Sequence, residues 1–95
     1  MDLKELKINK FDDKKGPTYD CGKVKLLIRK KGSICADHSH AVQEILYLIS
    51  GEMELTVGDE TKIVKALTRI FIQPNEYHKF LALSDLEIIE DREGE

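Results

Sequence analysis

Residues 32–51 read GSICADHSHAVQEILYLISG, and this stretch contains two of the three histidines of the chain, His38 and His40. One residue separates them, and on a β-strand positions i and i+2 point to the same face. Two imidazoles on one face can share a metal ion at ligand distances of about 2.0–2.2 Å. Glu44 follows four residues after His40, where the chain can turn and return along a neighbouring strand. The stretch therefore predicts a strand pair that carries metal-ligating side chains.

The third histidine, His78, lies after Pro74 at the start of another apolar segment. An antiparallel sheet can bring that segment beside the first, so that three neutral nitrogens and one carboxylate oxygen converge. Taken singly, each residue has a simpler explanation, because a histidine on an apolar strand is more often a satisfied core residue and a lone glutamate is a surface charge. Their joint spacing favours a shared metal site.

Short apolar runs separated by turn residues fill most of the chain, and this rhythm is typical of an all-β sandwich or barrel. In residues 52–57 apolar and polar residues alternate, as in a half-buried strand. A strand is expected over residues 44–50, in which residues 45–49 are apolar on both parities, as in a strand covered on both faces in a core or a dimer interface. Gly58-Asp59 is a hairpin turn signal. Further strands are expected over residues 23–30, 63–64, 70–72, 77–83 and 86–89.

The two ends of the chain are less regular. Residues 3–7 can start a short helix, and residues 7–11 can equally form an edge strand. The charged C-terminal tail, residues 90–95, is expected to fray, above all over residues 91–95. No window of about twelve residues has a convincing 3.6-residue period, so the expected fold class is all-β.

Size and charge limit the classes of function. With 95 residues, a single domain over residues 1–95 is expected. A chain this short is marginally stable without help from a metal, a disulfide or a partner chain. The 15 basic and 18 acidic residues give a net charge of −3. Without a basic surplus, neither nucleic acid nor an anionic membrane is an expected partner.

The sequence also indicates the cellular compartment of the protein. No run of about 18 apolar residues predicts a membrane span, and the charged segment 1–13 lacks the apolar core of a signal peptide. We therefore expect a cytoplasmic protein. The two cysteines, Cys21 and Cys35, lie fourteen positions apart and form no C-x-x-C pair. A disulfide between them is not expected in that compartment.

The histidine stretch resembles the first motif of the cupin family, which has the form G-x5-H-x-H-x3-E-x6-G. Every position matches, and the matching residues are Gly32, His38, His40, Glu44 and Gly51. The specificity of this spacing makes the resemblance strong, and with the second motif it spans about residues 32–80.

Residues 74–78, PNEYH, resemble the end of the second cupin motif, in which a proline is followed after a short turn by a histidine. The glycine usual in this turn is absent, and Asn75 or Glu76 takes its place. Asparagine tolerates the left-handed conformation, so the turn can survive. The departure leaves the role of His78 intact.

The resemblance implies a single-domain cupin-type double-stranded β-helix, that is, an RmlC-like jelly-roll barrel. It also implies one divalent metal ion held by His38, His40, Glu44 and His78. Such nitrogen and carboxylate ligation suits iron, manganese, nickel or zinc and does not choose among them. Four protein ligands leave up to two positions open in octahedral geometry, as a catalytic site requires.

Strand parity suggests the walls of a small, largely apolar cavity. Phe80 and Ala82 share the parity of His78, and weaker candidates are Ile34, Ala36, Leu46, Leu48 and Tyr47. Cys35, three residues before His38, is expected to face away from the metal. No Arg or Lys falls on the inward parity next to a ligand, which argues against a highly anionic substrate, although Arg69 and Lys79 can reach in from a rim.

The favoured function is a metal-dependent enzyme that acts on a small molecule, with oxygenase-like or isomerase-like chemistry. Glu44 can serve as a ligand and also as a base. The alternatives are a non-catalytic module that binds a small molecule or a metal, and a barrel in which the metal is purely structural. A homodimer is expected, because small barrels have sheet edges that need cover.

Overall fold

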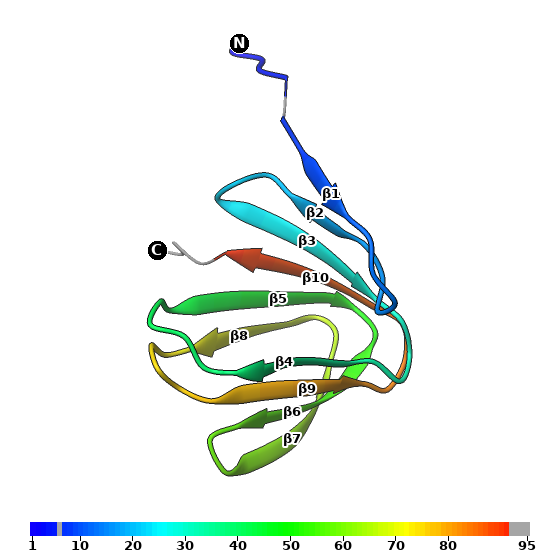
Figure 1. Cartoon of the computed structure of the whole chain (residues 1–95), viewed down its shortest axis with the longest axis vertical. Helices are drawn as coiled ribbons and strands as arrows, with labels where there is room; N and C mark the ends of the chain where they lie inside the picture. Colours follow the sequence, from blue (N-terminus) through cyan, green and yellow to red (C-terminus); the bar gives the residue numbers. More distant parts are fainter. Residues whose placement is uncertain (6, 92–95) are drawn as a thin grey trace.

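The computed structural model describes residues 1–5 and 7–91, and within them it contains strands and connecting segments but no helix. Two antiparallel sheets form the fold (Figure 1). The strands are β1 (Asn9–Phe11), β2 (Thr18–Asp20), β3 (Val24–Arg29), β4 (Ile34–His38), β5 (Glu44–Ser50), β6 (Glu52–Val57), β7 (Glu60–Lys65), β8 (Thr68–Ile72), β9 (His78–Ala82) and β10 (Leu86–Asp91).

The order of strands shows the crossing connections of a jelly roll. Six strands form one sheet in the order β1-β2-β3-β10-β5-β8, and four form the other in the order β4-β9-β6-β7. The chain passes from one sheet to the other at each connection from β3 to β6 and again at each connection from β7 to β10. Segments distant in sequence therefore become neighbours, as β4 and β9 do.

The core lies between the two sheets and is built by period-2 alternation. On the six-stranded sheet Leu46 and Leu48 of β5 point inward, and on the four-stranded sheet Met53 and Leu55 of β6 do so. Each such side chain contributes about 1.5–3 kcal/mol by leaving water. The predicted strands over residues 44–50 and 52–57 are confirmed with the same bounds.

Gly51 marks the point where the chain leaves the larger sheet for the smaller one. Its φ is 96°, a conformation that favours glycine. A β-carbon here would lie 2.3 Å from the Asp85 carbonyl oxygen, so the position excludes larger residues. The predicted hairpin at Gly58-Asp59 is confirmed, because β6 and β7 pair directly across it.

The chain ends differ in part from expectation. Residues 9–11 form the edge strand β1 rather than a helix. The expectation that residue 91 frays is wrong, because Asp91 belongs to β10 and pairs with both Val24 and Ile45. Leu6 and residues 92–95 lie outside the described residues. Over the part of the chain that is described, no helix is long and apolar enough to cross a membrane.

Candidate metal centre

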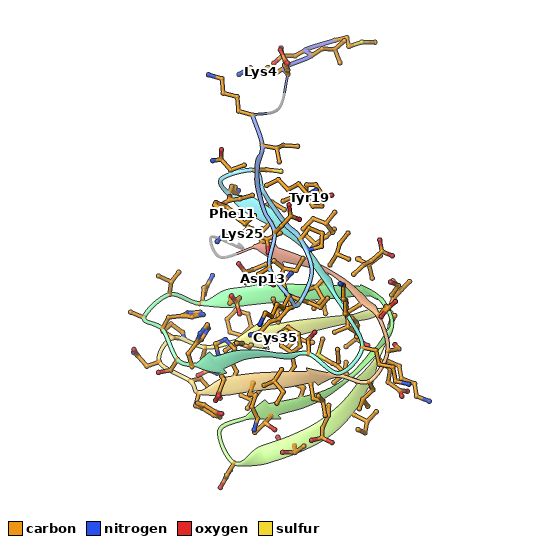
Figure 2. The ribbon with its side chains drawn as sticks, turned by 45° about the vertical axis from the view of Figure 1, so that its right-hand side comes forward. Lys4, Phe11, Asp13, Tyr19, Lys25 and Cys35 are labelled. Carbon is orange, nitrogen blue, oxygen red and sulfur yellow. The ribbon has the colours of Figure 1, made fainter. Side chains whose placement is uncertain are left out.

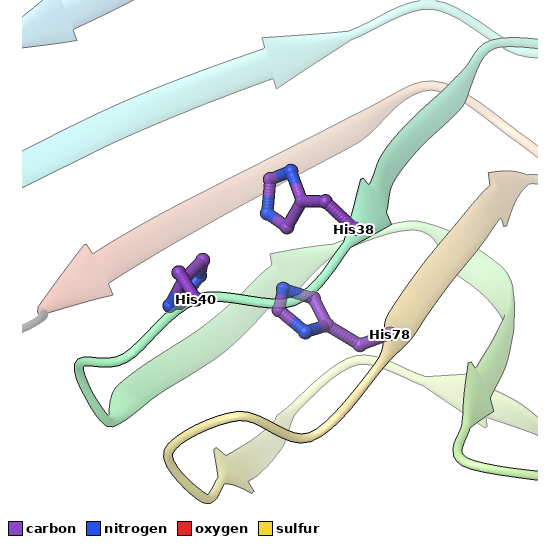
Figure 3. Close-up of side chains that lie close together, drawn as sticks. All are labelled: His38, His40 and His78. Atoms are coloured by element: carbon purple, nitrogen blue, oxygen red, sulfur yellow. The ribbon is translucent and has the colours of Figure 1, made fainter.

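The three histidines of the chain come together at one place (Figure 3). The ring centroids of His38 and His40 are 5.0 Å apart, those of His38 and His78 4.9 Å, and those of His40 and His78 5.0 Å. One ring nitrogen from each residue lies within 4.8 Å of the other two. The rings therefore point toward a common centre rather than to separate surfaces.

Different elements deliver the three rings. His38 is the last residue of β4 and pairs with His78, the first residue of β9. His40 lies beyond the end of β4, so the expectation that His38 and His40 share one regular strand is wrong. The segment around His40 is tied down because its carbonyl oxygen accepts a 2.7 Å hydrogen bond from the Asn75 amide.

The turn after Pro74 supports this arrangement. Asn75 has a φ of 66°, so it takes the left-handed conformation expected for the residue that replaces the family's usual glycine. The Asn75 amide that donates a hydrogen bond to the His40 carbonyl oxygen belongs to this same turn. This turn thus positions both residues. It donates a hydrogen bond to His40, and it leads into β9, which begins at His78.

Glu44, the first residue of β5, closes the cluster from the side of the larger sheet. Its side chain is buried, with the residue only 2% exposed. One carboxylate oxygen lies 3.4 Å from His78 Nε2, and the other lies 3.6 Å from His40 Nε2. The structure thus places all four residues predicted as metal ligands in one cluster.

Backbone carbonyls orient two of the rings. Nδ1 of His40 lies 2.9 Å from the Val42 oxygen, and Nδ1 of His78 lies 3.0 Å from the Glu76 oxygen. A carbonyl oxygen only accepts, so each Nδ1 carries the hydrogen, and in the neutral ring each Nε2 then presents a lone pair. Both Nε2 atoms are buried without a hydrogen-bond partner among the described residues. A hydrogen bond at Nδ1 is what fixes a metal-binding imidazole.

These residues fit a divalent metal ion. Atoms that share an ion at about 2.0–2.2 Å lie roughly 3–4 Å apart. The separations from Glu44 to His40 and His78 fall in this range, and the nitrogen spacing is slightly wider. Buried, unpartnered lone pairs next to a buried carboxylate are costly without a cation or a proton between them.

A β-bulge in β4 changes which side chains face the cluster. Cys35 pairs with Phe80 and His38 with His78, so β4 advances one residue more than β9 over the same distance. The bulge residues Ala36 and Asp37 have φ of 71° and 32°. The extra residue puts Cys35 and His38 on the same side.

The expectation that Cys35 faces away from the metal site is therefore wrong. Cys35 is buried and lines the same cavity as His38. Figure 2 shows it between the two sheets. Burial raises the pKa of its thiol, while the charges of Arg29 and Lys15 act in the opposite direction. Cys35 and Cys21 are both free thiols, as expected.

A cavity of about 210 Å³ begins at His38 and Glu44 and continues between the sheets. Of the residues predicted to line it, the structure places Ala36, Leu46 and Phe80 on its wall. Leu48 and Ala82 point inward but lie in the packed core instead.

Two of the predicted wall residues are misplaced. The prediction for Ile34 is wrong, because its side chain is on the outer side of β4 and is 50% exposed. The prediction for Tyr47 is also wrong, because it lies beside Arg69 on the outer side of β5. Arg69 therefore does not reach into the cavity from its rim.

Sequence reasoning missed most of the cavity wall on the larger sheet, which is formed by Thr18, Lys25, Leu27, Arg29 and Glu90, and it also missed Cys35 on the facing strand β4. Apolar residues 24, 26 and 28 share one parity of β3, and that parity faces outward. Leu27, flanked by two cations, is the inward residue. Lys25 and Arg29 thus line the cavity from β3, a strand without a predicted ligand, which the expectation about Arg and Lys next to a ligand did not cover.

Over the described residues, the ten strands form an antiparallel jelly roll, and its clustered histidines could hold a metal ion, so the fold and the site together define a class of small β-barrels. Residues 26–90, more than half of the chain, match the cupin domain family, and the chain belongs to this family. No match was found among curated proteins.

Solved structures share the fold at low sequence identity. Capsular polysaccharide assembling protein CapF from Staphylococcus aureus is 19% identical with a TM-score of 0.77, over 92% of this chain and 29% of that one. A predicted oxalate decarboxylase from Thermotoga maritima is 19% identical with a TM-score of 0.70, over 95% and 96%. Salicylate 1,2-dioxygenase from Pseudoaminobacter salicylatoxidans (W104Y mutant) is 9% identical with a TM-score of 0.67, over 70% and 20%. The chain thus spans less than a third of CapF and of the dioxygenase.

Proposed function

We propose that residues 1–95 form one cupin domain that binds a divalent metal ion through His38, His40, Glu44 and His78 and acts as a metal-dependent enzyme on a small molecule. The observation that carries the proposal is the pair of buried Nε2 lone pairs on His40 and His78, both within 3.6 Å of the Glu44 carboxylate. Iron, manganese, nickel and zinc all suit this donor set.

The cavity favours a functional over a purely structural metal. A structural site is closed by its ligands, whereas a catalytic site keeps an open side. His38 is exposed, and both His38 and Glu44 line the cavity, so a small molecule has access to the cluster. The bound ion would supply Lewis-acid chemistry to an oxygen-containing ligand.

The chain's own residues have defined roles in this proposal. The carbonyls of Val42 and Glu76 hold the His40 and His78 rings in orientation. Glu44 would balance the charge of the ion, and because its carboxylate lines the cavity beside the histidines, it is the candidate base. Oxygenase-like and isomerase-like reactions both fit, and the fold neighbours include a salicylate 1,2-dioxygenase and a predicted oxalate decarboxylase.

The test starts from protein purified without a His-tag and analysed for metals. We expect about one divalent ion per chain, lost on chelation. Replacing His78 by Ala is expected to lower the affinity for Mn²⁺ or Zn²⁺ in calorimetry by more than about 100-fold, because loss of a direct ligand exceeds the 10–100-fold effect of losing a supporting contact. Lys79→Ala, on the neighbouring residue of β9, is the control and is expected to leave the affinity unchanged.

Further outcomes separate the alternative functions. A metal-free chain that stays folded but loses turnover or ligand binding supports a functional site, whereas unfolding on chelation supports a structural metal. Oxygen consumption that fails with Zn²⁺ in place of iron or manganese indicates an oxygenase. Ligand binding without any turnover indicates a binding module. Wild-type protein that takes up no metal under any loading condition contradicts all three functions: the enzyme, the binding module and the structural metal.

We also propose a homodimer that pairs through the outer face of the larger sheet. There Tyr19, Leu26, Ile89 and Tyr47 form one row across β2, β3, β10 and β5. All four are only partly buried. An apolar row on a sheet surface is typical of an interface with another chain. The free state of both cysteines is in keeping with the cytoplasmic location that we propose.

A further inference from the structure

Two cations of β3 line the cavity that reaches the histidine cluster. Lys25 and Arg29 lie on either side of Leu27, and all three face the space between the sheets. Figure 2 shows Lys25 on this part of the larger sheet and Cys35 across from it. The cavity volume of about 210 Å³ is below the roughly 300–1,000 Å³ of sites for drug-sized ligands. The space therefore suits a ligand of few atoms.

Arg29 is held in place by neutral oxygens. Its Nη1 donates to the carbonyls of Pro17 at 3.0 Å and Ile28 at 2.9 Å, with Gly16 farther away at 3.5 Å. Its Nη2 donates to Thr18 Oγ1 at 2.8 Å. Its side chain also makes a hydrogen bond with Cys35. Nη1 has two N–H groups for its three carbonyl acceptors and Nη2 donates one to Thr18, so at least one of the five guanidinium N–H donors is still left for another acceptor. None of the four acceptors carries a charge, so they orient the cation without neutralising it.

Lys25 is only loosely paired. Its Nζ lies 3.9 Å from the Asp20 carboxylate, with both side chains partly exposed. Such a long, partly solvated ion pair contributes little. A ligand anion can therefore draw Lys25 into the cavity at small cost.

The charges in the cavity favour an anion once a metal is present. Lys25 and Arg29 bring two positive charges, and ionised Glu44 and Glu90 bring two negative ones. A divalent ion then leaves an excess of two positive charges, which Asp20 beside Lys25 reduces to one. An excess of positive charge in a partly enclosed space is relieved by an anionic ligand.

The remaining wall is apolar. Leu27, Leu46 and Phe80 line it, and all three are buried. A hydrocarbon skeleton can cover these side chains while an acidic group faces the cations. A carboxylate also matches the planar fork of an arginine.

We propose that this cavity binds a small carboxylic acid as its anion, with the carboxylate held by Arg29 and Lys25 and the carbon skeleton against Leu27, Leu46 and Phe80. The inference rests on the proposed metal site and names its substrate class. Arg29 and Lys25 are thereby residues that determine specificity, contributed by a strand that holds none of the proposed metal ligands.

The test is titration calorimetry of the Mn²⁺-loaded protein with pyruvate and benzoate, and with the neutral amides pyruvamide and benzamide. We expect the acids to bind at least about 10-fold more tightly than the amides, because a charge-assisted hydrogen bond contributes about 1.5–3 kcal/mol. Inorganic phosphate is the comparison anion and is expected to bind more weakly than either acid. Amides that bind as tightly as the acids, or phosphate that binds more tightly, would overturn the proposal.

Variants assign the effect to the cations. Arg29→Gln is expected to weaken carboxylate binding by about 10–100-fold while leaving Mn²⁺ affinity unchanged. Arg69→Gln, on the outer side of the same sheet, is the matched control. Because Arg29 also ties β3 to Pro17 and Thr18, thermal melting accompanies each measurement. If Arg29→Gln does not fold, the carboxylate affinity of Lys25→Gln is measured instead, with Lys79→Gln as its control.

The outcomes distinguish this proposal from the metal proposal. Normal metal binding with carboxylate affinity unchanged in both cation variants overturns the present inference alone. Wild-type protein that binds no metal but binds carboxylates through Arg29 overturns the metal proposal alone. Absence of both kinds of binding overturns both.

Discussion

His40 and His78 each hold a proton at Nδ1 by bonding to a carbonyl and bury a lone pair at Nε2. The arrangement arises from local chain geometry, because the bonding carbonyls belong to residues two positions away, Val42 and Glu76. A ring held in this way binds a metal without first losing rotational freedom. Replacing His78 by Ala removes one of these pre-oriented rings, which is why we expect the affinity for the metal ion to fall.

Cys35 offers a second prediction at the residue scale. Burial raises the pKa of its thiol above the ordinary value of 9.0, so the reactive thiolate is a small minority near neutral pH. With iodoacetamide near pH 7.5, we expect Cys21, which is partly exposed, to be modified first and Cys35 to react only after unfolding. Peptide mass spectrometry measures both sites in one sample. Equal rates in the folded protein would contradict the buried position of Cys35.

Among the elements, β4 has the greatest influence on the site. One extra residue at Ala36–Asp37 turns Cys35 and His38 to the same side. The Asp37 carboxylate accepts a hydrogen bond from the Tyr77 hydroxyl, next to His78, and this contact also raises the pKa of Tyr77. The bulge and the turn before β9 thus support each other where two proposed ligands meet.

The connection from β5 to β6 gives a prediction for an element boundary. Gly51→Ala combines a φ of 96° with a β-carbon 2.3 Å from the Asp85 oxygen. Backbone strain alone costs about 1–3 kcal/mol, and each kcal/mol lowers the Tm of a domain this size by about 4–8 °C. We expect Gly51→Ala to lower the Tm by about 10 °C or more in a calorimetric scan.

Gly32→Ala is the matched control for Gly51→Ala. Gly32 has a similar φ of 89° but no atom within 4 Å of an added β-carbon. It therefore tests strain without the clash, and we expect a smaller decrease in Tm. If the two variants melt at the same temperature, the close approach to Asp85 is not what requires glycine at position 51.

At the scale of the whole molecule, the two faces of the larger sheet differ in chemistry. Its inner face supplies Glu44 and the β3 cations to the cavity, and its outer face presents the apolar row from Tyr19 to Tyr47. Ile49 and Phe71, both exposed, extend the apolar surface on β5 and β8. The apolar parity of β3 therefore belongs to the outer face.

The quaternary prediction follows from that outer face. Light scattering during size-exclusion chromatography is expected to give about twice the chain mass of 10.9 kDa. Leu26→Glu places a charge in the middle of the row and is expected to shift the protein to a monomer, because a buried unpaired charge disfavours association. Ile63→Glu, at an exposed position on the other sheet, is the control. A wild-type monomer at all concentrations would contradict the homodimer.

The sequence by itself determined what depends on spacing along the chain. The strands 44–50 and 52–57, the left-handed Asn75 and the G-x5-H-x-H-x3-E-x6-G pattern were all predictable, because apolar runs, period-2 alternation and turn chemistry are local properties. Only the tertiary structure decided which parity faces inward. The bulge that turns Cys35 into the cavity and the reversed faces of β3 depend on register against β9 and β10, and register is set by packing across the sheets.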